Sequence, residues 1–180
     1  MPEKNTEPHT LLSQSDNKVC GSVWSARKMR WVLRFYPPLF FHRVVPVFVA
    51  DDFRSARVRV KRSLWTRNLN GTTFGGAIYS AADPVFALLY WQALARRGIA
   101  TRTWLMAARA QYRRPAATSL VLDFSLSEAD LDAAAEDLRR RGKAVRIHVV
   151  EVRDVRGTVC AELELVTFLR LLGPAEPPAF

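Results

Sequence analysis

The alternation of apolar and polar side chains predicts six strands along the chain. Two of them lie between residues 44 and 61 and turn at Asp51-Asp52. The second of these places alanine and valine on one face and basic residues on the other, as a half-buried strand does. The last two of the six form a hairpin around residues 154–157. The four later strands are expected at residues 101–114, 118–125, 145–153 and 158–170.

Three other segments predict helices. Residues 25–36 are amphipathic and stop at Pro37-Pro38. Residues 77–95 are apolar nearly all round and rich in Ala and Leu, which indicates a helix buried on most sides. Residues 127–141 predict a surface helix with Ser127 as its N-cap and a glycine just beyond its end. A buried helix between groups of amphipathic strands indicates an α+β fold with an antiparallel sheet.

The length of 180 residues corresponds to about one domain. We expect this single domain to span residues 25–172. Residues 1–24 are polar and lack a hydrophobic period, so they predict a flexible N-terminal arm. Residues 173–180 are rich in proline and predict a flexible C-terminal tail.

Composition narrows the possible functions. The chain carries 27 basic and 17 acidic residues, a formal net charge of +10, which suggests an anionic partner. Two cysteines and three widely separated histidines exclude a disulfide scaffold and match no metal-ligand spacing, so we expect neither metal nor cofactor. The first residues lack the basic and apolar segments of a secretory signal. With its cysteines expected to stay reduced, we predict a cytoplasmic protein.

Asp83 is the single formal charge between residues 67 and 96. A carboxylate in an apolar helix must be hydrogen-bonded, shifted in pKa or solvated by a cleft, so Asp83 is the leading site candidate. One alternative is that Asp83-Pro84 caps a helix that begins there. Another is a helix that starts near Gly75 and is kinked by Pro84, which frees the Ser80 carbonyl. A membrane span, the third alternative, is disfavoured by the polar residues inside the segment.

The segment from Asn68 to Asp83 resembles a known signature. It reads Asn-Leu-Asn-Gly-Thr-Thr-Phe-Gly-Gly-Ala-Ile-Tyr-Ser-Ala-Ala-Asp and is similar to hotdog-fold acyl-CoA thioesterases of the PaaI-like type. Those proteins carry an Asn, a Gly-Thr, a His-Gly-Gly and then an Ala-Asp at the spacing found here. The flanks resemble an uncharacterised branch of that superfamily, through Arg30-Trp31, the ending Tyr112-Arg113-Arg114-Pro115, and Gly142-Lys143. The resemblance covers approximately residues 29–170.

The resemblance implies the hotdog fold, in which an antiparallel sheet of five to six strands wraps around a long central helix. It also implies a homodimer or homotetramer with its sites at the dimer interface, and an acyl-CoA or acyl-carrier thioester as substrate. The amides of Gly75 and Gly76 would polarise the thioester carbonyl, although Gly-Gly is also common in tight turns. Asp83, inside the helix, would act as general base or nucleophile, with its pKa raised by apolar neighbours.

Other residues of the signature are expected around the substrate. Asn68 matches the family's Asn that orients the water or the carboxylate, and its alternative is a turn-forming Asn in the left-handed conformation. The paired arginines suit CoA phosphates, but a solvated strand end is favoured for at least one of them. The side chains expected to contact substrate are Phe74, Asn70, Tyr79, Arg113 and Arg114.

Phe74 departs from the pattern, because many relatives carry His before Gly-Gly and a Phe side chain donates no hydrogen bond. The alternative function is therefore a non-catalytic acyl- or acyl-CoA-binding protein of the same fold. A third hypothesis is a basic protein that binds an anionic membrane surface. Nucleic-acid binding rests on net charge alone, without a recognisable module, and is not expected, nor is a transmembrane segment. The membrane hypothesis rests on aromatic residues interleaved with cations: Trp24, Trp31, Phe35, Phe40 and Phe41 with Arg27, Lys28, Arg30, Arg34 and Arg43.

Overall fold

The computed structural model describes residues 23–173 and residue 176. Six strands and five α-helices follow one another along this part of the chain, with one short 3₁₀ helix before the central helix. Their bounds are α1 Ala26–Phe35, α2 Pro37–Phe41, β1 Val44–Val49, β2 Ser55–Val60, η1 Leu64–Thr66, α3 Gly75–Ala82, α4 Val85–Arg96, β3 Thr101–Tyr112, β4 Leu120–Ser125, α5 Glu128–Arg141, β5 Lys143–Asp154 and β6 Val159–Leu171.

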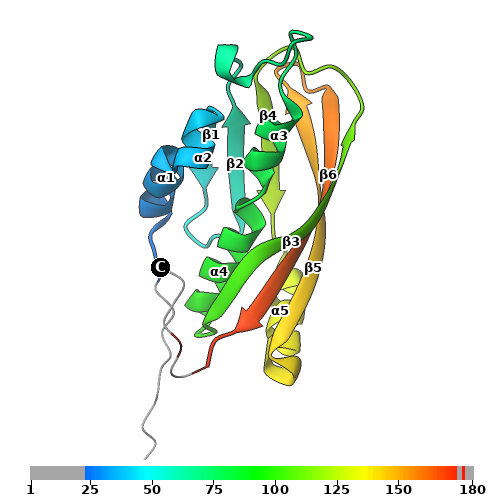
Figure 1. Ribbon diagram of the computed structural model, residues 1–180. Helices are drawn as coiled ribbons and strands as arrows, with labels where there is room; N and C mark the ends of the chain where they lie inside the picture. The colour runs from blue at the N-terminus through cyan, green and yellow to red at the C-terminus, as the bar shows by residue number, and fades with distance from the viewer. Residues whose placement is uncertain (1–22, 174–175, 177–180) are drawn as a thin grey trace, which may run out of the picture.

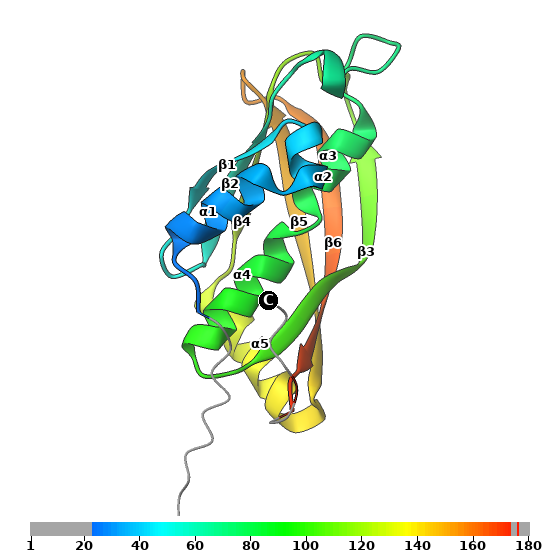
Figure 2. The same cartoon turned by 60° about the vertical axis from the view of Figure 1, so that its left-hand side comes forward.

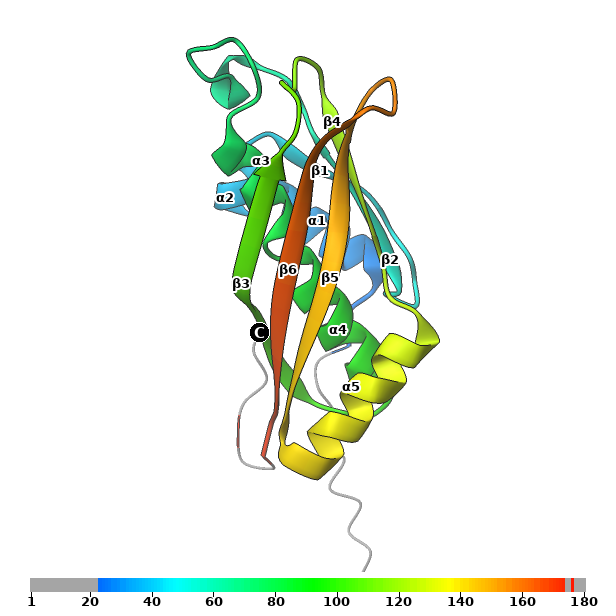
Figure 3. The same ribbon diagram turned by 90° about the vertical axis from the view of Figure 1, so that its right-hand side faces the viewer.

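The six strands form one sheet in the order β1-β2-β4-β5-β6-β3. Every neighbouring pair is antiparallel. Figure 1 shows the sheet curving around the helix formed by α3 and α4, and Figure 3 shows β3, β6 and β5 side by side with that helix behind them. The predicted α+β class, the antiparallel sheet and the hotdog arrangement are therefore confirmed.

The apolar segment predicted at residues 77–95 forms the central helix. It starts earlier, at Gly75, and is divided into α3 and α4 at Asp83 and Pro84. Both residues keep right-handed helical backbone angles, but Pro84 has no N–H to bond to the Ser80 carbonyl. The kinked-helix alternative is thus confirmed, and the N-cap alternative for Asp83 is wrong because Asp83 is itself helical. In the described part of the chain, no helix is long and apolar enough to cross a membrane.

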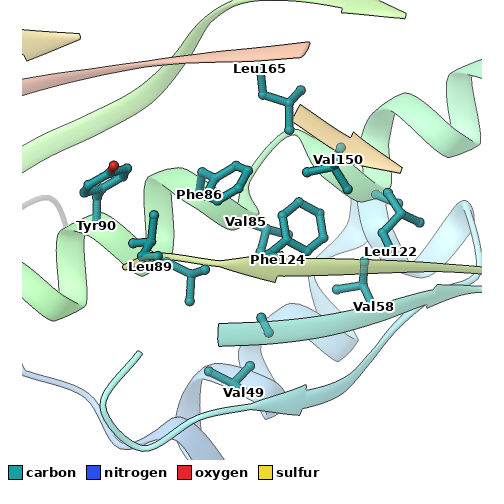
Figure 4. Close-up of a cluster of buried hydrophobic side chains, with 14 of the residues drawn as sticks. Val49, Val58, Val85, Phe86, Leu89, Tyr90, Leu122, Phe124, Val150 and Leu165 are labelled. Atoms are coloured by element: carbon teal, nitrogen blue, oxygen red, sulfur yellow. The ribbon is translucent and has the colours of Figure 1, made fainter. Parts of the chain in front are cut away.

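The core lies between this central helix and the inner face of the sheet. Figure 4 shows Phe86 and Leu89 of α4 packed among side chains from β2, β4, β5 and β6. The Phe86 ring meets the Phe124 ring edge to face, with 5.3 Å between centroids. Nearly all of α4 is buried, because its apolar residues cover the whole circumference and the sheet wraps around them.

The flanking helices follow their local signals. Ser25 accepts a hydrogen bond from the Lys28 amide and begins α1. Ser127 and Asp130 form a capping box at the start of α5, and Gly142 ends that helix in the left-handed conformation. Both predicted surface helices are therefore confirmed.

The expected arm and tail fall largely outside the described residues, so their flexibility and the domain bounds remain predictions. Two residues of the expected arm are described. The Trp24 ring packs edge to face on Trp91 at 5.5 Å, and its amide donates to Gln92 Oε1 at 2.7 Å. At the other end, Arg170 is paired with Glu176.

Candidate active site at the start of the central helix

Hydrogen bonds within the loop between β2 and α3, and from this loop to a later segment, fix its conformation. The Phe74 amide donates to the Thr66 carbonyl at 2.7 Å, and the Thr73 amide donates to the Ala116 carbonyl at 2.8 Å. Arg62 reaches across the loop and donates to the Gly71 carbonyl at 2.6 Å. These bonds hold the residues before the helix in place although they belong to no strand or helix.

Asn68 closes a turn within this loop. Its side-chain amide donates to Thr72 Oγ1 at 2.9 Å, and its Oδ1 accepts from the Thr72 amide at 3.0 Å. The alternative of a turn-forming Asn is correct in that Asn68 closes a turn, but its left-handed conformation is wrong, because Gly71 has the positive φ of this turn. Asn68 is therefore engaged with its own loop, while it also faces the neighbouring cleft.

Gly75 and Gly76 form the first turn of α3, and in the described part of the chain neither amide donates a hydrogen bond. Free amides at a helix start are available to a ligand. Two aromatic rings explain why both residues must be glycine. A Cβ on Gly75 would lie 2.8 Å from the Tyr112 hydroxyl oxygen, and a Cβ on Gly76 would lie 2.3 Å from the Phe74 ring.

Asp83 follows Gly76 by seven residues along the same helix, with Tyr79 between them on the same side. Its carboxylate has no hydrogen-bond or ion-pair partner among the described residues, and the residue is exposed in the single chain. Neighbouring protein atoms still dehydrate it in part, and this desolvation raises the pKa of Asp83 above its ordinary value. The direction matches the expectation from its apolar neighbours.

A cleft of about 470 Å³ opens beside the helix start. Arg113 and Arg114 reach it from the end of β3, where both of their amides donate to the Cys160 carbonyl at 2.8 and 3.0 Å. The two side chains differ. Arg113 is paired with Glu162 at 3.2 Å, whereas the Arg114 guanidinium has no partner within the described chain.

The structure therefore divides the expected site residues into two groups. Asn68, Asn70, Gly75, Arg113 and Arg114 line the cleft together. Phe74, Gly76, Tyr79 and Asp83 do not line it. Tyr79 and Asp83 are exposed along the outer side of α3.

Tyr112 lines the cleft and also contacts the start of α3, so it lies between the two groups. Sequence reasoning did not identify it as a site residue. Its hydroxyl donates to the Gly75 carbonyl at 3.2 Å. Desolvation, and to a smaller extent Tyr79, raise the pKa of Tyr112. The signal that could have identified it is its place in the Tyr-Arg-Arg-Pro ending that carries the family resemblance.

Two more cleft residues were also missed. Thr73 is buried, and its hydroxyl finds no partner among the described atoms. Cys160 is buried, and desolvation raises the pKa of its thiol, which disfavours the reactive thiolate. A lone Thr and a lone Cys carry no local pattern that marks a cleft.

Comparison with solved structures supports the same architecture. A Pseudomonas aeruginosa protein of unknown function, described as a probable thioesterase, matches with a TM-score of 0.74 and 16% identity over 84% of this chain and 99% of its own. A thioesterase from Haemophilus influenzae gives 0.61 and 11% over 87% and 96%. The PaaI protein of E. coli gives 0.52 and 16% over 79% and 91%. Comparison with curated protein sequences finds no significant match.

These likenesses and the sheet-wrapped helix define a hotdog-fold protein, as the sequence resemblance implied. By sequence, the chain belongs to the family described as "Domain of unknown function (DUF4442)", whose sequence model matches residues 26–169.

Proposed function

We propose that this protein hydrolyses an acyl thioester at the start of its central helix. The observation that carries the proposal is the pair of unpartnered amides at Gly75 and Gly76 on the same helix as the unpartnered carboxylate of Asp83. Structural neighbours described as thioesterases support it.

The reaction needs one acceptor for a proton and one donor set for a developing oxyanion. Asp83 takes a proton from water while the water oxygen attacks the thioester carbon, or its carboxylate attacks directly and water cleaves the resulting anhydride. The carbonyl oxygen gains negative charge and accepts hydrogen bonds from the Gly75 and Gly76 amides. The C–S bond then breaks, and the thiolate leaves and is protonated.

Helix geometry requires two protomers for this step. Gly75 and Asp83 are eight residues apart, a rise of about 12 Å at about 1.5 Å per residue. Both must lie within about 3 Å of one reacting group, which one chain cannot arrange. The proposed enzyme is therefore a homo-oligomer, a dimer or a tetramer built as a dimer of dimers, in which Asp83 of one protomer faces the glycine amides of its partner.

The long edge strand β3 supports this assembly. It runs for twelve residues with one edge unpaired in the single chain, and an exposed edge can add a strand from another copy. The opposite edge strand, β1, has only six residues and contains Pro46, which has no N–H to donate. Joining two copies through β3 would bring the outer sides of their α3 helices together.

The proposed substrate is a CoA or acyl-carrier thioester in the reducing cytoplasm. The Arg114 guanidinium is free to bind phosphate, whereas Arg113 is already paired with Glu162. Both of these carriers hold the thioester on a phosphate-bearing arm, so one free arginine beside the helix start suits either of them.

The first test is thiol release from acyl-CoAs of varied chain length and from one aromatic thioester. We expect wild-type hydrolysis and its loss in Asp83→Asn, with the fold retained by circular dichroism. Equal hydrolysis by wild type and Asp83→Asn would exclude the mechanism.

Mixing two inactive variants tests the shared site. The first is a double variant, Gly75→Pro with Tyr112→Phe. The proline removes the amide N–H of residue 75, and the phenylalanine removes the hydroxyl that the proline would contact. Tyr112→Phe alone is the control. Refolding this double variant with Asp83→Asn should restore about a quarter of wild-type activity, because half of the dimers are mixed and each holds one intact site. No recovery in verified mixed dimers would contradict the two-protomer geometry.

A non-catalytic acyl-binding protein is the second candidate, and Phe74 favours it. Its ring packs over Gly76 and donates no hydrogen bond. Under this alternative, acyl-CoA binds in calorimetry without thiol release, and Asp83→Asn leaves the affinity unchanged.

A further inference from the structure

A second region, away from the helix start, carries positive charges that no ion pair within the described residues neutralises. Six basic side chains lie on one side of the molecule. They come from α1, from the residue before β1, from β2 and from the residue after β2. None of them has a side-chain hydrogen bond or ion pair among the described residues. Asp51 is the one acidic residue in the cleft that five of them line. The six are Arg27, Arg30, Arg34, Arg43, Arg59 and Lys61.

Four aromatic rings lie among these cations. Trp31 is 58% exposed and Phe35 is 56% exposed, and their rings stack at 5.4 Å. Phe40 and Phe41 on α2 are 46% and 55% exposed and meet edge to face at 5.7 Å. These four rings and the six cations are called the basic aromatic face. Trp24, grouped with them in the sequence, does not belong to this face, because it packs against Trp91.

Folding does not require the outer side of α1. The helix buries Ala26, Met29 and Leu33, the residues that face the body of the protein. Arg27, Arg30 and Arg34 point outward at spacings of three and four residues, where like charges repel and destabilise a helix. Exposed rings likewise add no core packing. The repulsion among these arginines weakens the isolated helix, and an anionic partner would relieve it, while the exposed rings offer that partner an apolar surface.

The basic aromatic face is hollowed in two places and extends over α1, α2 and β1. An open cleft of about 830 Å³ runs between α1 and β1, and its walls include Arg30, Trp31 and Phe48. A second hollow of about 180 Å³ is lined by Phe35, Phe40 and Arg43 and connects α1 to α2. Figure 2 shows α1 and α2 following each other across the front of the molecule, and Phe35 of α1 and Phe40 of α2 line the same hollow.

We propose that the basic aromatic face docks the protein on an anionic lipid bilayer. The cations bind headgroup phosphates, and Trp31, Phe35, Phe40 and Phe41 enter the boundary between headgroups and acyl chains. A helix with rings among arginines on its outward side is the pattern of segments that lie in the plane of a membrane surface. Aromatic rings with a polar or cationic neighbour are also favoured at that depth.

Co-sedimentation with vesicles tests the charge requirement. We expect binding to vesicles of phosphatidylcholine mixed with phosphatidylglycerol, no binding to phosphatidylcholine alone, and release near 1 M salt, where the screening length is about 3 Å. The triple variant Arg27→Gln, Arg30→Gln, Arg34→Gln should lose about 100-fold in partitioning, since each surface cation contributes about fivefold.

A matched control removes the same charge elsewhere. Arg139→Gln, Lys143→Gln and Arg156→Gln change three exposed cations that have no ion pair in the described chain. This control should bind vesicles as wild type does. Circular dichroism and hydrolysis of a water-soluble thioester, which should be unchanged in both triple variants, separate docking from folding and from the proposed thioesterase function.

Quenching by lipids brominated in the acyl chain tests insertion. Anionic vesicles should quench part of the wild-type tryptophan fluorescence, and Trp31→Phe should show a smaller quenched part while still sedimenting. The proposal is overturned if wild type does not sediment with anionic vesicles or if both triple variants lose binding equally. It is also overturned if the cleft binds inorganic phosphate or an acidic protein in solution but no vesicle.

Discussion

At the scale of single residues, the candidate site consists of polar groups that the fold leaves unsatisfied. Among the described residues, the Asp83 carboxylate, the Gly75 and Gly76 amides and the Arg114 guanidinium have no partner. Each such group costs folding stability when it is partly dehydrated. Unpartnered groups at both ends of α3 and in the cleft beside it are therefore typical of a binding or catalytic site.

Asp83→Asn should raise stability while it removes hydrolysis. The folded-state pKa of Asp83 is raised, so at neutral pH the charged carboxylate opposes folding, and this penalty disappears below the unfolded pKa of about 3.9. Thermal melts at pH 7 should give a higher Tm for Asp83→Asn than for wild type. The wild-type kcat/KM should fall as acidification protonates the base, at a pH above the ordinary Asp range. A lower Tm for Asp83→Asn at neutral pH would contradict this account.

Arg114→Gln and Arg113→Gln should behave differently. Arg114 is free for phosphate, so Arg114→Gln should raise KM for acyl-CoA roughly tenfold, with kcat little changed. Arg113 is paired with Glu162, and Arg113→Gln should change KM less. An acyl thioester of N-acetylcysteamine, which lacks the nucleotide, is the control substrate and should be insensitive to Arg114→Gln. Equal KM effects on both substrates would exclude the phosphate role.

At the scale of elements, the central helix is divided where its carboxylate lies. Pro84 interrupts the hydrogen-bond ladder directly after Asp83, yet both residues stay helical. Proline inside a helix costs about 3 kcal/mol relative to alanine. The sheet wrapped around α4 compensates for this cost by burying most of the helix.

Pro84→Ala should stabilise the protein and impair catalysis. The alanine N–H can bond to the Ser80 carbonyl, so the free energy of unfolding should rise by about 1–3 kcal/mol. The straightened helix moves Asp83, so kcat should fall by about tenfold or more. Denaturant titration and thiol release measure the two effects. Pro38→Ala in the first turn of α2 is the control, and a Pro84→Ala protein with wild-type kcat would show that the kink is not needed.

At the scale of the whole molecule, a side-chain contact between α4 and β5 links the central helix to the middle of the sheet. The hydroxyl of Tyr90 in α4 lies 2.9 Å from His148 Nε2 in β5, and the His148 ring stacks on Phe86 at 4.2 Å. Burial raises the pKa of Tyr90 and lowers the pKa of His148. The nearby Asp130 opposes the second shift, and Arg146 adds to it. Burial therefore favours a neutral histidine in the folded protein.

Stability should consequently fall as the solution is acidified. The unfolded His148 titrates near pH 6.5, and its folded pKa is lower, so its stabilising contribution is complete above that pH and is lost below it. Thermal melts of wild type between pH 8 and pH 5 should show this loss, and His148→Asn should flatten the dependence. Tyr90→Phe should lower stability by about 1 kcal/mol at every pH but keep the slope. An unchanged slope in His148→Asn would assign the pH dependence to other groups.

The sequence by itself determined the six strands, three helical segments and their order, but it did not predict the short helices α2 and η1. The six strands, the buried helix, the cap at Ser127 and the stop at Pro37 follow from local periodicity and local hydrogen bonding, which depend on near neighbours in the chain. The helix position of Asp83 and the identity of Gly75 and Gly76 as its first residues could be inferred from the signature. These features are local, so the pattern of residue types was sufficient to predict them.

Only the tertiary structure decided which polar groups remain free and which residues meet. Arg113 and Arg114 are equivalent in the sequence, but Glu162, which comes from a different strand, forms an ion pair with Arg113 only. Tyr112 reaches Gly75 from 37 residues away, and Trp24 turns inward to Trp91 while Trp31 stays outside. Each of these outcomes depends on contacts between segments distant in the chain. Residue spacing encodes the conformation of a segment, and only the folded chain sets the partners of its side chains.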